Sequence, residues 1–230
     1  MTITIGIDLA ASAHRTAAVR IAFTPTPQLV DATLGVDDAM LERLLTDRAA
    51  QRIGVDAPTG WPEAFVDAVA RWPAAFTTAE VVQLRLRETD RFVHTTTGRA
   101  PISVSADRLA VVAMRLVRVL DRIGEQDVSG GGRIVESYPA GALRAWGIDA
   151  RGYRVSVQTR RRVLAELGLP GDSTAGSEHL LDSVICAFVA QAARLGVTHT
   201  PDASQQAAAR REGWIHLPRA GSLAAVRGVR

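Results

Sequence analysis

Several residue types are scarce in this sequence, and their scarcity narrows what the protein can be. The 230 residues include no lysine, so all 27 basic residues are arginine. A single cysteine, Cys186, excludes an intramolecular disulfide and a cysteine-rich zinc site. No apolar run approaches the ~20 residues of a membrane span, so we expect no membrane partner. The first residues lack the basic and apolar segments of a secretory signal, which predicts a cytoplasmic protein.

Charge of one sign is also not in large excess. The formal net charge is +3. Apolar residues make up 47% of the sequence and charged residues 22%, which is typical of an ordinary globular protein. Arginine keeps its charge and grips phosphate with a planar fork, but abundant arginine and alanine also follow from a biased genomic composition. The charge balance therefore permits a nucleic-acid partner without requiring one.

The hydrophobic pattern predicts an α/β protein whose first 60 residues run β-β-β-α-β. The first three strands form an antiparallel meander, because the TPTP turn separates the second strand from the third. The length of the chain suits one sizeable core or two small domains, and we expect one domain over residues 1–230. The expected strands are 3–9, 15–23, 28–35, 52–58 and 133–139; the expected helices are 37–50, 62–72, 105–124, 140–147, 157–168 and 176–196.

Residues of about 59–130 interrupt this pattern and predict a helical cap inserted into the domain. Two helices, 62–72 and 105–124, flank the polar segment RLRETDRFVHTTTGRAPISVS at 85–105. We expect that segment to be a loop or a flap, because it is dense in polar and turn-forming residues. The residues REGWIHLP at 211–218 predict a last short extended segment.

Four acidic residues interrupt apolar segments where a buried core is expected. Asp8 lies in the first strand, Asp56 and Glu136 each follow two β-branched residues near a strand end, and Asp182 shares a helix face with Ile185. Each has an ordinary alternative: Asp56 as a turn cap, Asp182 or Glu136 as the partner of an arginine. Burying an unpaired carboxylate is costly, so four such positions call for a common explanation.

Divalent cations supply that explanation. Several carboxylates can share one pocket when Mg²⁺ or Mn²⁺ neutralises them, and both ions prefer hard oxygen ligands. Two such ions can activate a water molecule and stabilise a leaving oxygen during phosphodiester cleavage. The pattern therefore predicts a site holding two ions, where the first, fourth and fifth strands meet the C-terminal helix.

The order of these segments resembles the domain-of-unknown-function family four-two-nine, described as predicted nucleases of the ribonuclease H-like fold. The matching segments are IGIDLAAS (5–12), RIGVDAPTGWP (52–62), RLRETDRFV (85–93), RIVESYPAGAL (133–143), HLLDSVICAFVA (179–190) and REGWIHLP (211–218). The resemblance implies a mixed five-stranded sheet flanked by helices and a metal-dependent nuclease, a hydrolase, acting on nucleic acid. It also implies that Asp8, Asp56, Glu136 and Asp182 form the acidic catalytic and metal-binding cluster.

Three further polar residues are candidates for substrate binding. Arg87 and Asp90 belong to the RETD motif of that family; Arg87 could hold a phosphate that Asp90 helps to position, or the two could form a surface ion pair. His179 precedes Asp182 by one helical turn and could be an outer base, a ligand or a structural residue.

Two other classes of function remain open. GIDLAAS is similar to the phosphate loop of actin-like ATP-dependent phosphotransferases, but Leu9, Ala10 and Ala11 stand where such loops place glycine. The chain could also be a nucleic-acid or protein-binding module that kept the fold without the chemistry. The sequence does not specify the nucleic acid or the oligomeric state.

Overall fold

A single mixed sheet organises the protein. A computed structural model describes residues 1–71, 81–102 and 109–228, and its five-stranded sheet has the order β3-β2-β1-β4-β5. The β1–β2 and β2–β3 pairs are antiparallel, whereas β4 is parallel to both β1 and β5. This arrangement confirms the predicted α/β, ribonuclease H-like fold with its first three strands antiparallel. The strands are β1 (Thr2–Asp8), β2 (Ala17–Phe23), β3 (Pro27–Leu34), β4 (Arg52–Asp56) and β5 (Ile134–Glu136).

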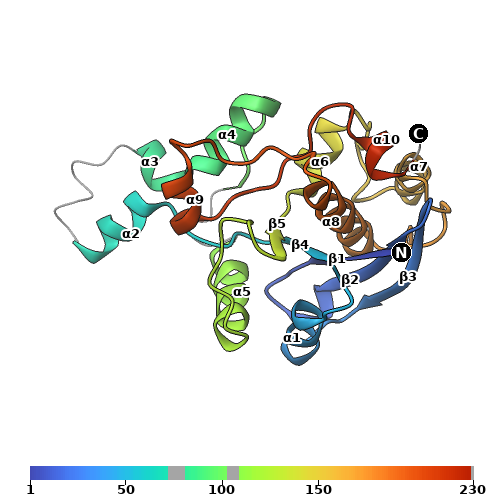
Figure 1. Cartoon of the computed structure of the whole chain (residues 1–230), viewed down its shortest axis with the longest axis horizontal. Coiled ribbons are helices and arrows are strands. Elements are labelled where there is room, and N and C mark those ends of the chain that lie inside the picture. Colours follow the sequence, from blue (N-terminus) through green and yellow to red (C-terminus); the bar gives the residue numbers. More distant parts are fainter. Residues whose placement is uncertain (72–80, 103–108, 229–230) are drawn as a thin grey trace.

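Helices cover both faces of the sheet and extend past its β5 edge (Figure 1). α8 lies on one face and α1 on the other, while α2, α3, α4 and α9 lie beyond β5. The helical elements are η1 (Ala13–Arg15), α1 (Asp38–Thr46), α2 (Glu63–Ala70), α3 (Val81–Arg85), α4 (Glu88–Thr97), α5 (Ala110–Arg122), α6 (Pro139–Ala145), α7 (Val157–Leu167), α8 (Glu178–Arg194), α9 (Gln206–Glu212) and α10 (Leu223–Val226).

Two glycines allow α8 to lie directly on the central strands. A Cβ atom on Gly6 would come within 1.9 Å of the Ser183 carbonyl oxygen, and one on Gly54 within 2.2 Å of the Cys186 carbonyl oxygen. The two glycines are register partners in β1 and β4, so together they form a shallow seat for the helix. Side chains as small as alanine do not fit there, because the atoms they would meet belong to the helix backbone.

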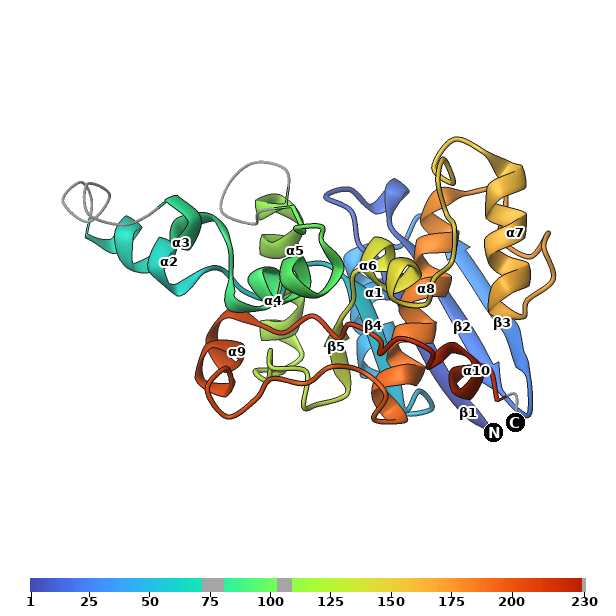
Figure 2. The ribbon, with the colours of Figure 1, turned by 90° about the horizontal axis from the view of Figure 1, so that it is seen from above.

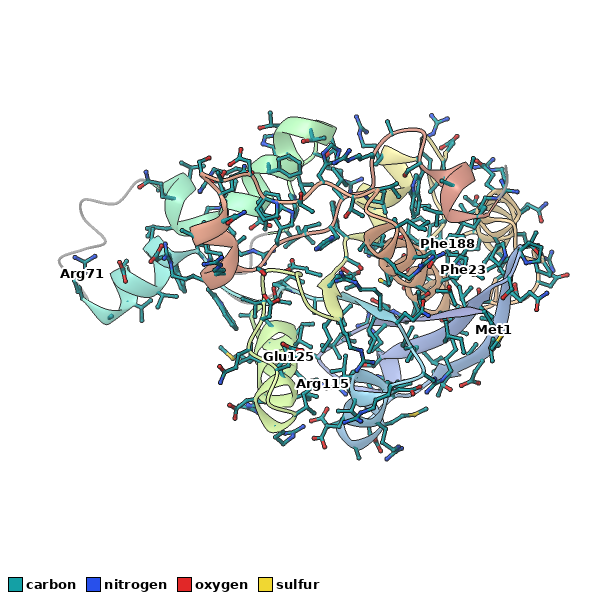
Figure 3. The ribbon with its side chains drawn as sticks, in the orientation of Figure 1. Met1, Phe23, Arg71, Arg115, Glu125 and Phe188 are labelled. Carbon is teal, nitrogen blue, oxygen red and sulfur yellow. The ribbon has the colours of Figure 1, made fainter. Side chains whose placement is uncertain are left out.

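Packing beside this seat fixes the position of α8. The Thr4 hydroxyl donates to the Ala187 carbonyl at 2.9 Å, which ties β1 to the helix. Phe188 of α8 meets Phe23 of β2 edge to face, with ring centroids 5.2 Å apart (Figure 3). This hydrophobic core also takes in buried residues of α6 and α7.

The opposite face of the sheet carries a second core. Ile5, Ile7 and Val55 pack there against leucines of α1 and against the buried side of α5. Arg115 of α5 reinforces this contact by donating from Nη1 to the Ala10 carbonyl at 2.7 Å, and it lies between α5 and α1 in Figure 3. α5 is thus attached to the chain immediately after β1.

The segment that we expected to be a loop or flap, 85–105, is largely helical, which corrects that prediction. Residues 88–97 form α4, and Arg85 ends α3. Arg87 and Asp90 cap the first turn of α4 reciprocally, and Val93 is fully buried. The polar composition concealed this helix because its capping and buried positions are occupied by charged residues and threonines.

Two other boundaries differ from the expected ones. Arg211 and Glu212 end α9 rather than beginning an extended segment, although Ile215 and Pro218 beyond them make isolated β-bridges. The first residues of the predicted helix 105–124 lie outside the described residues, and α5 is described from Ala110.

The predicted cap segment, 59–130, contains two kinds of helix. α5 contributes to the core on the sheet, whereas α2 and α3 lie at the far end of the molecule and α4 lies between them and β5 (Figure 2). The division into one domain with an inserted cap stays a prediction. In the part of the chain that the structure describes, no helix has the length and apolar character required to cross a bilayer.

Candidate active site

Six of the seven predicted site residues line one cavity of about 500 Å³. The cavity lies where β1, β4 and β5 end beside the first turns of α8, as expected for an open α/β sheet. The seventh residue, Asp90, is buried behind Arg87 and is absent from this lining. The six are Asp8, Asp56, Arg87, Glu136, His179 and Asp182.

Strand register brings Asp8 and Asp56 together. They are partners in the parallel β1–β4 pair, so their backbones are about 4.8 Å apart, the spacing of neighbouring strands. Side chains alternate along a strand, so both carboxylates share the face of Gly6 and Gly54, on which α8 lies. Among the described residues, none is within hydrogen-bond or ion-pair distance of the Asp56 carboxylate.

α8 adds the third carboxylate, Asp182. Ser177 caps the helix by accepting from the Leu180 backbone amide, and Asp182 follows on the buried side. Tyr153 donates its hydroxyl to Oδ1 of Asp182 at 2.9 Å. Ser183, the next residue, accepts from the Asp8 amide at 3.3 Å, which attaches the strand end to this turn of the helix.

The three aspartates share an unfavourable electrostatic environment. Burial, followed by the charges of Asp8 and Asp182, raises the pKa of Asp56 well above its usual range. Burial, followed by the charge of Asp8, raises the pKa of Asp182 to about 7. None of the three forms an ion pair with an arginine in the described part of the chain. Burial and the neighbouring carboxylates outweigh the charge of Arg154, which opposes the rise in the pKa of Asp56 and of Asp182.

Among the described residues, His179 is the basic residue that hydrogen-bonds to this trio. Its Nδ1 lies 2.6 Å from Oδ2 of Asp8, and that hydrogen bond raises the pKa of His179. The ring is half-buried at the cavity wall, one turn before Asp182. His179 therefore orients Asp8 and partly balances its charge when protonated.

Glu136 is separated from the aspartates by its place in the sheet. In the β4–β5 pair its partner is Val55 and not Asp56, so alternation directs it toward the opposite face. Arg87 donates to Oε1 at 2.6 Å and to Oε2 at 2.8 Å, and Thr59 donates its amide and its hydroxyl to Oε2. Both oxygens are engaged, so Glu136 does not fit the role of a free metal ligand that the resemblance implied.

Arg87 has no donor left for a substrate phosphate. Its Nε and Nη2 bind Asp90, its Nη1 and Nη2 bind Glu136, and Nη1 also donates to the Glu212 carbonyl at 3.1 Å. These contacts use all five N–H groups of a guanidinium. Arg87 and Asp90 do form an ion pair, but it is buried and not on the surface.

Sequence reasoning missed the residues that surround the acidic group. Tyr153 and Arg154 approach from the loop between α6 and α7, and Thr59 follows β4. The charge and hydrogen bond of Asp182 and, above all, burial raise the pKa of Tyr153, so its hydroxyl stays protonated as a donor. No local pattern marks such loop residues; they are recognised only through what they contact.

The chemistry of the trio fits a hard divalent cation. Asp8, Asp56 and Asp182 offer carboxylate oxygens, which Mg²⁺ and Mn²⁺ prefer, and a cation would relieve their repulsion. In the described residues, no three His, Cys, Asp or Glu side chains already have the arrangement of a metal site. Binding would therefore require these side chains to rotate toward the ion.

The raised pKa of Asp182 predicts that the metal-free protein loses stability as the pH rises from about 5 to 8. The unfolded chain releases this proton near pH 4, whereas the folded protein retains it up to about pH 7, so deprotonation disfavours folding. Asp182→Asn removes that titration. Urea unfolding in EDTA should show that the wild type loses about 2–4 kcal/mol more than the variant. Equal losses would contradict the expectation.

Comparison with known families places the chain in one of them. Residues 6–206 match the family described as "Protein of unknown function (DUF429)", and the protein belongs to that family. The match includes every candidate site residue from Asp8 to Asp182. A comparison with curated proteins found no match.

Two solved structures are similar to the protein at low sequence identity. One is "T. thermophilus RuvC in complex with Holliday junction substrate", with 11% identity, a TM-score of 0.43 and coverage of 85% of this chain and 97% of that chain. The other, "Thermus thermophilus RuvC structure", has 11% identity, a TM-score of 0.42 and the same coverage of 85% and 97%.

Proposed function

We propose that this protein is a metal-dependent nuclease that hydrolyses phosphodiester bonds of nucleic acid. The observation that supports the proposal best is the trio of Asp8, Asp56 and Asp182. In a chain with 27 arginines, three clustered carboxylates have no arginine partner among the described residues, while nearby Glu136 has one. The proposal assigns these three, and not Glu136, to Mg²⁺ or Mn²⁺, with two ions at the site.

In this proposal some side chains bind the cations and others position the side chains that bind them. Bound divalent cations would supply an activated water molecule and charge stabilisation at the phosphate. Asp8, the register partner of Asp56, would hold the ions together with Asp56 and Asp182. His179 would fix the orientation of Asp8, and Tyr153 that of Asp182, so that both carboxylates keep a free oxygen for an ion.

In this proposal Arg87 and Asp90 do not contact the substrate; they hold Glu136 in place. The buried ion pair places Arg87 at the cavity wall without exposing a donor, so it would shape the site and not bind the phosphate. Glu136 would be a structural residue for the same reason.

The test is cleavage of labelled RNA, DNA and branched DNA by the wild-type protein with 1–10 mM Mn²⁺ or Mg²⁺, concentrations on the order of those that saturate weak carboxylate sites. We expect cleavage of at least one substrate, which EDTA abolishes and added Mn²⁺ restores. Calorimetric titration of the same protein with Mn²⁺ should report saturable binding. Absence of cleavage with every substrate, or cleavage that EDTA leaves unchanged, would overturn the proposal.

A further inference from the structure

A second cavity, of about 630 Å³, adjoins the candidate active site. Its walls are the end of α4, the helix α6 and the loop that follows α6. Figure 2 shows α6 between α4 and α8, and the loop after α6 contributes Tyr153 and Arg154 to the active-site cavity. Ala140, Tyr153 and Arg154 line both cavities, so the two share a wall.

The second cavity is rich in arginine. Arg99, Arg144, Arg151 and Arg154 line it, with Asp149 as its one carboxylate. Asp149 is paired with Arg151 at 2.9 Å. In the described residues, the other three guanidinium groups have no carboxylate within ion-pair distance, so none of them is held in an ion pair.

One of these arginines, Arg154, also lines the active-site cavity, and the charge of Arg99 reaches a residue of the cavity wall. Burial raises the pKa of Tyr138, a residue of the active-site wall, and the positive charges of Arg99 and Arg154 oppose that rise. The charge of Asp182 in turn acts on Arg154. A basic pocket therefore adjoins an acidic one, with Ala140, Tyr153 and Arg154 at the boundary.

We infer that the arginine-lined cavity binds a phosphate of the nucleic-acid backbone next to the phosphodiester that lies in the active-site cavity. This inference rests on the proposed nuclease function and specifies how the substrate is held. Guanidinium groups bind phosphate oxygens in pairs, and Arg99 and Arg144 are exposed and available for it. The buried Leu143 and Ile148 form an apolar floor that suits a sugar.

The arginine-lined cavity also explains how a negatively charged nucleic acid could bind beside three aspartates. Three aspartates repel a polyanionic strand, so the strand needs attraction from a neighbouring surface. Arg99, Arg144 and Arg154 supply it on the side of α6, and the cations supply it at the aspartates. A substrate with at least two phosphates would therefore bind better than a single phosphodiester.

The test is the salt dependence of binding, measured by fluorescence anisotropy of labelled single-stranded and double-stranded oligonucleotides. An Asp8→Asn background removes cleavage, so only binding is observed. Arg99→Gln together with Arg144→Gln should weaken binding about tenfold or more. It should also reduce the slope of log affinity against log salt by about 0.7 to 0.9, the value for one phosphate that is no longer neutralised.

A matched control separates a local site from general charge. Arg161→Gln together with Arg211→Gln removes the same charge from exposed positions that line neither cavity, and its slope should match that of the parent. An unchanged slope in the Arg99/Arg144 variant, an equal loss in the control, or no oligonucleotide binding by the parent would each overturn the inference. Binding with the expected slopes but no cleavage by the wild type would retain the anion site and overturn the nuclease.

Discussion

Replacing Asp8 by Asn is expected to lower metal-dependent cleavage at least about 1,000-fold, which corresponds to about 4 kcal/mol of transition-state stabilisation. Asp8 is the carboxylate at the centre of the trio: it is the register partner of Asp56, and its charge raises the pKa of Asp182. The amide of asparagine keeps the shape of the side chain but removes its charge. The loss should therefore be in metal binding and turnover, with the fold intact.

The measurement is the rate of oligonucleotide cleavage together with calorimetric titration of Mn²⁺. Asp56→Asn and Asp182→Asn should show losses of the same kind, because all three carboxylates are assigned to the ions. Asp172→Asn is the control, since Asp172 is an exposed carboxylate paired with Arg161 on the surface. Cleavage by Asp8→Asn at the wild-type rate would refute the assignment.

Replacing Arg87 by Met should cost about 3–5 kcal/mol of folding stability, the usual effect of removing one partner from a buried ion pair. Two carboxylates, Asp90 and Glu136, would lose their cation while staying buried. For a chain of this size the loss lowers the melting temperature by roughly 10 °C. Thermal and urea unfolding of the purified variant check this.

Arg91→Met is the matched control, because Arg91 pairs with Glu88 near the surface of the same helix. Its effect should be within about 1 kcal/mol, as for other exposed pairs. Adding Glu136→Gln to Arg87→Met should recover part of the lost stability, which a double-mutant cycle measures. Saturable Mn²⁺ binding by Glu136→Gln is also expected; loss of that binding would show that Glu136 is a metal ligand after all.

The sequence predicted the sheet because each strand carries a clear local signal. β-branched residues mark β1, β2, β4 and β5, and the acidic residues at three strand ends indicate where the cavity lies. The family resemblance implied that the five strands form one mixed sheet, and the structure adds their order. The helix α4 was missed because its N-cap is Arg87, and its apolar side is reduced to a few residues such as Val93.

The site was predicted less completely, for a physical reason. Whether a carboxylate is free depends on register and on distant partners, and a linear pattern shows neither. Glu136 and Asp56 look alike in the sequence, each following an apolar strand, yet a one-residue difference in register sends them to opposite faces. Tyr153 and Arg154 lie on a loop and carry no periodic signal at all.

Gly6 and Gly54 have a further consequence for how the site responds to a ligand. The seat they form joins β1, β4 and α8 by backbone contact, so Asp8, Asp56 and Asp182 stand on a single rigid block. The opposite wall is built differently, with Tyr153 and Arg154 on a loop between two helices. We therefore expect that loop, and not the three aspartates, to move when ligands of different width bind. The spacing of the three aspartates is set by Gly6 and Gly54, which have no side chain.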